Sequence, residues 1–149
     1  MKAVVQRVRE ASVSADGRVV GQTGVGLLVY VGVEQGDTDS DIALLARKTA
    51  QLRIFADEQG KMNRSVIDVK GSVLVISQFT LCADTRKGNR PSYNKAEEPG
   101  QAEKMVASFA ERLETCYTVP VETGCFGAYM QVASVNDGPV TILLDSAQR

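Results

Sequence analysis

The chain has 149 residues, with 17 Lys and Arg against 18 Asp and Glu, and it contains no histidine. This length fits a single domain over residues 1–149, and the net charge of −1 argues against a protein that coats long duplex nucleic acid. The absence of histidine excludes Ser-His-Asp and Cys-His nucleophile systems, as well as most catalytic zinc sites.

Three strands are predicted in the first part of the sequence. Residues 2–15 are rich in Val with partial alternation, which is typical of a strand, and a turn follows at 16–18. Residues 19–22 can return antiparallel to the first strand. Residues 27–33 form a continuous apolar run, which is typical of a strand buried on both faces.

A helix and another buried strand are predicted in the middle of the chain. Residues 37–40 offer several N-cap side chains, and apolar residues at a spacing of three and four continue to residue 52, as in an amphipathic helix. Residues 53–55 are expected to be extended, and 57–60 are expected to form a turn. The apolar run 73–76 predicts the next buried strand.

The last part of the chain begins with a charged segment, residues 83–100, which contains two prolines and predicts a long loop. Loops of this length in a compact domain are often functional. A second amphipathic helix is expected from about residue 101 to 113 or beyond. Three more strands are predicted, at 119–121, 128–135 and 140–145.

Residues 136–139, Asn-Asp-Gly-Pro, are expected to form the turn that joins the last two strands. Long runs of strands surround each helix, which argues against a doubly wound nucleotide-binding fold. The sequence therefore predicts one α+β domain, with a strongly curved mixed or antiparallel sheet, or a barrel-like sheet, and two main helices.

The three cysteines, Cys82, Cys116 and Cys125, are odd in number and form no C-x-x-C pair. The N-terminal residues lack the apolar core of a signal peptide, and the longest apolar runs are too short to cross a bilayer. We therefore expect a reduced, cytoplasmic protein without disulfides and without a membrane partner.

Ser77, Gln78, Phe79 and Thr80 follow directly after the predicted strand 73–76. Polar residues at this position often mark no more than the exit of a strand into solvent. They can also form an oxyanion site, in which the main-chain N–H groups of Phe79 and Thr80 face a developing alkoxide. Thr80 can alternatively be a nucleophile, although no base lies near it in the sequence.

Three further segments are also open to two interpretations each. Gly138-Pro139 is either an ordinary turn or a cis bond whose neighbouring carbonyls form a paired acceptor for an ammonium group. The loop cations Arg86, Lys87 and Arg90 are either solvated or bind phosphates. Tyr93 can stack on a base. The same ambiguity holds for the segment 60–63, which contains Met62 and Asn63.

The sequence resembles the D-aminoacyl-tRNA deacylase family over nearly its whole length, in five short segments that occur in the same order. Each segment alone is a weak signal, whereas the ordered set is highly specific. The matching stretches are Gln6-Arg7-Val8, Gly60-Lys61-Met62-Asn63, Ser77-Gln78-Phe79-Thr80-Leu81, Arg90-Pro91-Ser92 and Asn136-Asp137-Gly138-Pro139-Val140-Thr141. Tyr93 stands where this family frequently has Phe, which keeps an aromatic surface.

The resemblance implies an enzyme that hydrolyses the ester between a D-amino acid and the 3′-terminal adenosine of tRNA, and that also removes glycine from mischarged tRNA(Ala). It implies a homodimer with its active site at the subunit interface, and it implies neither a metal nor another cofactor. Ser77, Gln78, Phe79 and Thr80 would line the pocket for the terminal adenosine.

By the same resemblance, a cis Gly138-Pro139 pair would enter the active site of the opposite subunit. Its carbonyls would hold the α-amino group of the substrate, and an L side chain would collide with it. Arg7 would brace the pair. The ribose 2′-hydroxyl would assist the reaction, while main-chain N–H groups near Phe79 and Thr80 would stabilise the oxyanion.

Three alternatives remain open from the sequence. A related subgroup that removes mischarged L-alanine has a trans Gly-Pro bond and altered pocket residues. A non-catalytic module that binds RNA ends is compatible with the basic loop and the missing histidine. A purely structural barrel is the least favoured of the three.

Overall fold

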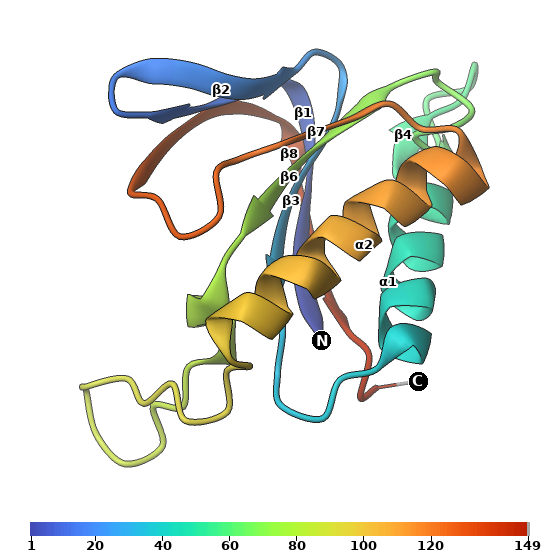
Figure 1. Ribbon diagram of the computed structural model, residues 1–149. Coiled ribbons are helices and arrows are strands. Elements are labelled where there is room, and N and C mark those ends of the chain that lie inside the picture. Colours follow the sequence, from blue (N-terminus) through green and yellow to red (C-terminus); the bar gives the residue numbers. More distant parts are fainter. Residues whose placement is uncertain (149) are drawn as a thin grey trace.

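A curved mixed sheet forms the body of the protein, and two helices lie against one of its faces (Figure 1). The computed structural model describes residues 1–148. The strands are β1 (Lys2–Ala15), β2 (Arg18–Thr23), β3 (Gly26–Gly32), β4 (Phe55–Ala56), β5 (Met62–Arg64), β6 (Ser72–Ser77), β7 (Val121–Thr123) and β8 (Met130–Asp145). The helices are α1 (Asp39–Gln51), the short 3₁₀ helix η1 (Phe79–Cys82) and α2 (Pro99–Tyr117).

The main sheet has the order β2-β1-β3-β6-β7, and β8 pairs with β1 as well. β1 pairs antiparallel with β2, β3 and β8, whereas β3–β6 and β6–β7 are parallel. The two ends of this order approach each other, since the Gln22 N–H donates to a Glu122 carboxylate oxygen at 2.6 Å. A Cβ added at Gly21 would lie 2.6 Å from the Thr123 carbonyl oxygen. The sheet is therefore nearly closed, and the predicted fold class is confirmed.

The apolar runs of β3 and β6 are buried on both faces because the sheet has a core on each side. Leu27 and Val73 belong to the core between the sheet and the helices. Leu28 and Leu74, one residue later, belong to a second core inside the curve of the sheet. Because successive side chains of a strand point to opposite faces, uninterrupted apolar runs are needed to supply both cores.

The N-terminus of each α-helix, α1 and α2, is fixed by a carboxylate. The Asp41 side chain accepts from the Thr38 N–H at 2.8 Å, which forms the capping box of α1. At α2, the Glu98 carboxylate accepts from the N–H groups of Gly100 and Gln101, at 3.0 and 3.1 Å. Pro99, predicted to lie in a loop, is the first residue of α2, because proline is well tolerated at that position.

The predicted hairpin over residues 128–145 is wrong: a single strand, β8, spans most of it. Gln6 of β1 pairs with Thr141 and Val8 pairs with Asn136, so residues 137–140 stand opposite the single residue Arg7. The Asn136 side chain closes this bulge by accepting from the Val140 N–H at 2.9 Å. A β-bulge therefore replaces the expected turn, and the chain continues in the same direction.

Two short predicted strands are displaced. The extended segment expected at 53–55 becomes β4 at Phe55–Ala56, and the strand expected at 119–121 becomes β7 at Val121–Thr123. No helix within residues 1–148 is both long enough and apolar enough to span a membrane.

Candidate active site

At the carboxyl end of β6, Ser77 still pairs with Val31 of the parallel strand β3. The next N–H, that of Gln78, donates to the Val31 carbonyl at 2.7 Å. The chain then bends into η1, which begins at Phe79. Because the first N–H groups of a helix have no partner inside it, those of Phe79 and Thr80 remain available, and neither finds another protein acceptor in the part of the chain described.

The Gln78 side chain holds the Thr80 hydroxyl. Its Nε2 donates to Thr80 Oγ1 at 2.5 Å. A hydroxyl that accepts this bond keeps its own hydrogen for donation, since a hydroxyl has one donor and two acceptor positions. No histidine exists to take that hydrogen as a base, so the arrangement suits Thr80 as a hydrogen-bond donor better than as a nucleophile.

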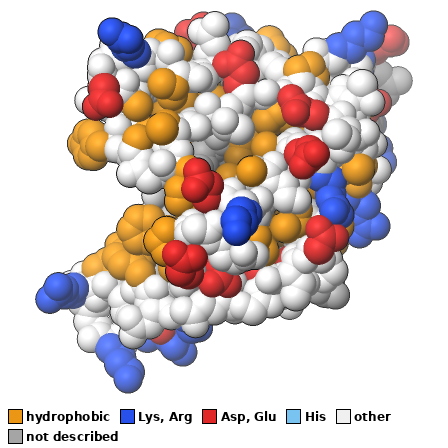
Figure 2. Space-filling model, viewed as in Figure 1, with side chains coloured by type: hydrophobic (Ala, Val, Ile, Leu, Met, Phe, Trp, Pro, Cys, Tyr) orange, Lys and Arg blue, Asp and Glu red, His pale blue; other side chains and the backbone are white. Residues whose placement is uncertain are grey.

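Beside η1 lies a cavity of about 720 Å³. Its walls come from the end of β6, the first turn of α2, the loop after β7 and the start of β8. Figure 2 shows a notch on this side of the molecule with hydrophobic side chains above and below it. Four aromatic residues line the cavity: Phe79, Tyr93, Phe126 and Tyr129.

Three of these four aromatic residues, Phe79, Tyr93 and Tyr129, are exposed to solvent. Tyr129 is 90% exposed and Phe79 is 59% exposed. Phe79 and Tyr93 meet edge to face, with ring centroids 4.9 Å apart. A wide, apolar, aromatic-lined cavity of this size is typical of a site for a flat ligand such as a nucleobase. The sequence interpretation missed Phe126 and Tyr129, although two aromatic residues beside Gly127 in a short segment between strands were a usable signal.

The basic loop after η1 is closed by reciprocal main-chain bonds between Asp84 and Ser92, at 2.8 and 2.9 Å. It projects away from the body beside the notch, and Lys and Arg side chains gather there (Figures 1 and 2). Within it, Arg86 Nε donates to Asp84 Oδ1 at 2.9 Å, and these hydrogen bonds hold the pKa of the Asp84 carboxyl well below its usual range. Lys87 and Arg90 are exposed and form no ion pair within residues 1–148.

The Gly138–Pro139 bond is cis, as the resemblance implied. Both residues are exposed, because the bulge pushes them out of β8. Gly138 has a φ of +139°, and a Cβ added there would lie 2.8 Å from Val140 Cγ2 and 3.0 Å from Arg7 Nη2. Only glycine fits this conformation without displacement of its neighbours.

Arg7 joins the bulge to another part of the chain. Its Nε donates to the Asp137 carbonyl at 2.9 Å, and its Nη1 donates to the Ile54 carbonyl at 2.5 Å. The side chain is largely buried, with 15% of it exposed. A guanidinium offers five donors in a rigid fork, so one residue holds both the bulge and the segment that leads into β4.

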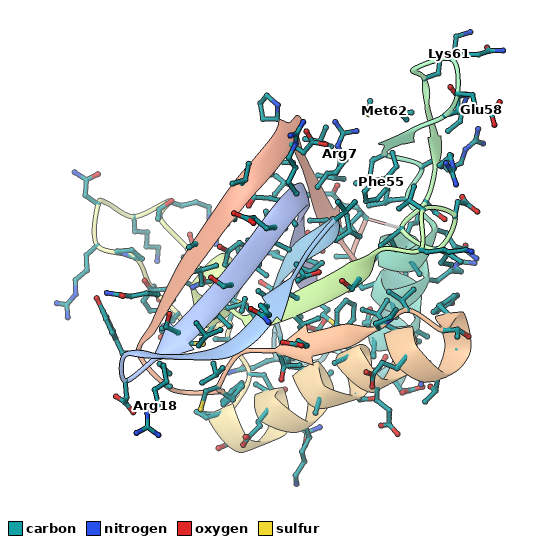
Figure 3. The ribbon with its side chains drawn as sticks, turned by 90° about the horizontal axis from the view of Figure 1, so that it is seen from above. Arg7, Arg18, Phe55, Glu58, Lys61 and Met62 are labelled. Carbon is teal, nitrogen blue, oxygen red and sulfur yellow. The ribbon has the colours of Figure 1, made fainter. Side chains whose placement is uncertain are left out.

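Met62 and Asn63 lie on the small hairpin of β4 and β5. The polar atoms of Asn63 already make intramolecular hydrogen bonds. Its carbonyl oxygen and side-chain oxygen both accept from Arg53, at 3.0 and 2.7 Å. Met62 is 55% exposed. Figure 3 places Met62 and Phe55 beside Arg7 at one edge of the molecule, whereas Arg18 lies at the opposite corner.

The structure does not bring all the candidate residues together in one chain. Arg7, beside the bulge, pairs with Leu27 of β3, whereas Ser77 pairs with Val31. Four residues along a strand correspond to about 13 Å, and β1 and β3 also lie between the two segments. The candidate residues thus form two separate groups. The cavity group consists of Ser77 to Thr80 at η1, and the bulge group consists of Gly138–Pro139 with Arg7.

Comparisons with known proteins show the family to which the chain belongs. The family model described as D-Tyr-tRNA(Tyr) deacylase matches residues 4–145. Curated relatives named D-aminoacyl-tRNA deacylase include those of Roseiflexus castenholzii, 58% identical with 99% of this chain and 93% of the relative covered, and Thermomicrobium roseum, 58% identical with 99% and 96% covered.

Among solved structures, the protein titled c-Myc DNA Unwinding Element Binding Protein is 44% identical, with a TM-score of 0.93 over 97% of this chain and 98% of that one. A structure titled as a probable eukaryotic D-amino acid tRNA deacylase has a TM-score of 0.79 over 96% of this chain and 97% of that one, and its 15% identity shows the shared fold alone. From the family match and the close relatives together, this chain belongs to the D-Tyr-tRNA(Tyr) deacylase family.

Proposed function

We propose that this protein hydrolyses the ester between a D-amino acid and the 3′-terminal adenosine of tRNA. Family membership over residues 4–145 is the observation that carries this conclusion. The unused N–H groups of Phe79 and Thr80 support it, because Phe79 lines a cavity large enough for a nucleoside and Thr80 is the next residue of η1. An aminoacyl ester is already reactive, so positioning and oxyanion stabilisation supply much of the rate without a histidine.

In the proposed reaction, water attacks the ester carbonyl carbon. The carbonyl oxygen becomes an oxyanion that accepts hydrogen bonds from the N–H groups of Phe79 and Thr80. The bond to the ribose 3′-oxygen then breaks, and the proton lost by the water passes to that oxygen with assistance from the neighbouring 2′-hydroxyl. The products are the free amino acid and tRNA with an intact 3′ end.

Ser77, Gln78, Phe79 and Thr80 line the adenosine side of this site in the proposal. Gln78 orients the Thr80 hydroxyl, and the bond at 2.5 Å supports a donor role for that hydroxyl. The base of the adenosine is expected to occupy the aromatic cavity, since stacking on aromatic side chains is worth about 1–3 kcal/mol per base.

For chiral selection, we propose a homodimer in which Gly138–Pro139 of one subunit enters the cavity of the other. The separation of the two groups within one chain supports this arrangement. The carbonyls of Gly138 and Pro139 would accept hydrogen bonds from the α-ammonium group, while Arg7 fixes the position of the bulge. An L side chain would point into the bulge and be rejected.

Glycine has no side chain that could collide with the bulge. The same site is therefore expected to hydrolyse glycyl-tRNA(Ala). This activity follows from the proposed steric selection, because the bulge excludes L side chains and does not exclude an amino acid that has no side chain.

We propose that the basic loop binds the phosphates of the tRNA 3′ end, with Lys87 and Arg90 as the principal contacts. Both are exposed and lack an ion-pair partner in the described part of the chain. From the sequence, Arg86 was a candidate phosphate contact as well. Because its guanidinium already binds Asp84, its contribution is expected to be to the shape of the loop.

Single-turnover deacylation of D-Tyr-tRNA(Tyr) tests the function. We expect the ester to disappear far faster with the protein than in buffer, with free D-tyrosine and rechargeable tRNA as products. Tight binding of the tRNA without any acceleration would instead support a non-catalytic RNA-end-binding module and would overturn the proposal.

A further inference from the structure

The hairpin of β4 and β5 holds Met62 on a rigid frame. The Asp57 carboxylate accepts from the N–H groups of Gln59 and Lys61, each at 2.9 Å, and from Asn63 Nδ2 at 2.8 Å. These bonds lower the pKa of the Asp57 carboxyl. The frame therefore fixes the position of Met62, whose side chain is 55% exposed.

A single exposed apolar residue is ordinary on a protein surface, so the position of Met62 carries the argument. Arg7 donates to the Ile54 carbonyl, one residue before β4, and to the Asp137 carbonyl, one residue before Gly138. The hairpin and the Gly138–Pro139 bulge are thus tied to one largely buried guanidinium. Figure 3 shows Arg7, Phe55 and Met62 at the same edge of the molecule.

Because of this tie, the hairpin and the bulge are expected to move as one body. Any partner surface that receives the bulge is then brought close to the hairpin. Within its own chain, Met62 lies at the Arg7 end of the sheet, away from the cavity at η1.

We infer that Met62 completes the active site of a second copy of this chain, where it covers the substrate that Gly138–Pro139 holds. This inference rests on the proposed cross-subunit site. The receiving cavity offers the exposed rings of Phe79 and Tyr129. A thioether makes favourable contacts with aromatic rings and adapts to irregular gaps, so Met62 suits a closing contact over a bound aminoacyl-adenosine.

Three variants of the intact protein test the role of the side chain. Met62→Asp places a charge in the closed site and is expected to raise KM for D-Tyr-tRNA at least tenfold, whereas Met62→Leu stays within about twofold of the wild type. Val19→Asp is the matched control, because Val19 is 60% exposed on β2, beside Arg18 at the far corner. Unchanged kinetics for Met62→Asp, or equal effects of Met62→Asp and Val19→Asp, would overturn the inference.

Heterodimers with two different affinity tags test which subunit Met62 serves. One subunit carries Phe79→Pro, which removes a main-chain donor of the cavity, and the other carries Met62→Asp. If Met62 acts across the interface, one site combines an intact cavity with an intact hairpin, and the heterodimer recovers about half of the wild-type kcat/KM. If Met62 acts within its own chain, both sites are damaged and nothing is recovered, which would overturn the inference.

A second heterodimer, with Gly138→Ala in place of Met62→Asp, separates this inference from the proposed function. Recovery with Gly138→Ala but not with Met62→Asp would leave the shared site standing and reject the role of Met62. Failure of both pairs to recover would reject the cross-subunit site itself, and the inference with it.

Discussion

The cavity group at η1 and the bulge group at Gly138–Pro139 are built in opposite ways. The first is concave and apolar, and its main-chain donors are unused. The second is convex, and its backbone is held by Arg7 and Asn136. The cavity follows from a regular strand end, whereas the bulge depends on particular residues at an irregularity of β8. The comparison teaches that the two groups have complementary shapes, one concave and one convex, as the proposed cross-subunit site requires.

The largest expected effect is at the cavity. Phe79→Pro removes one N–H donor at the first position of η1, where proline is well tolerated by a helix. Loss of one oxyanion donor is expected to lower kcat by about 10²–10³. Single-turnover rates with D-Tyr-tRNA measure this.

Phe79→Leu is the control, because it changes the exposed ring and keeps the N–H. It is expected to retain most of kcat. Equal losses in the two variants would show that the ring, and not the main chain, carries the effect.

At the bulge, Gly138→Ala is expected to lower kcat/KM for D-Tyr-tRNA at least tenfold. The added methyl would lie 2.8 Å from Val140 Cγ2, and the φ of +139° disfavours any L side chain. The bulge must shift, and small misplacements of a reacting group cost large factors in rate. Steady-state kinetics with D-Tyr-tRNA measure the change.

The matched control is Gly17→Ala, which also places a methyl at a positive φ, +74°, with no atom within 4 Å. It lies in the turn before Arg18, at the far corner of the molecule (Figure 3). We expect wild-type kcat/KM for this variant. A comparable loss there would mean that the effect at Gly138 reflects stability alone.

The spacing of apolar residues along the sequence predicted most helices and strands, because the burial of those residues determines which elements form. The uninterrupted apolar run at 27–33 and the amphipathic spacing at 37–52 each correspond to an observed element, β3 and α1. The single strand β8 was missed because Asn-Asp-Gly-Pro has the local chemistry of a turn. Pairing with β1 along most of its length overrides that local preference.

The candidate site was predictable only in part. Ser77 to Thr80 and Gly138–Pro139 stood out by their residue types, but their separation depends on strand register, which no local pattern contains. The ion pair between Arg86 and Asp84 was missed because two neighbouring charges in a loop do not reveal whether they meet.

A smaller effect is expected from the basic loop. Lys87→Gln and Arg90→Gln are each expected to raise KM several-fold and to reduce the slope of log(kcat/KM) against log[salt] by about 0.7, as for one lost contact to a single-stranded phosphate. Arg86→Gln is expected to change that slope less, because Asp84 already neutralises its charge. Titration of the salt concentration with D-Tyr-tRNA measures the slopes.

D-tyrosyl-adenosine, which lacks the phosphates, is the control substrate and is expected to be hydrolysed equally by all three loop variants and the wild type. A defect of the loop variants on this substrate would assign the loop to the reaction centre. Equal slopes for Arg86→Gln and Lys87→Gln would contradict the division of roles within the loop.

The smallest effect concerns the hairpin at low pH. The pKa of the Asp57 carboxyl is lowered by its hydrogen bonds to Asn63 and Lys61. The stabilisation of the hairpin by the ionised carboxylate is therefore complete above the ordinary carboxyl pKa of about 4, and it is lost as pH falls through the lowered pKa. Amide exchange at Gln59 and Lys61, followed from pH 6 down to pH 2 and corrected for the intrinsic exchange rate at each pH, should show loss of protection at the acid end. Asp57→Asn should show a weaker dependence on pH, and identical profiles for the variant and the wild type would contradict this role.

The central claim is that main-chain groups on a braced bulge select the D configuration at a cavity without histidine. Parallel deacylation of D-Tyr-tRNA(Tyr) and L-Tyr-tRNA(Tyr) by the wild-type protein tests this claim most directly. We predict rapid loss of the D ester, while the L ester decays at the rate measured in buffer. Equal acceleration of both esters would contradict the account.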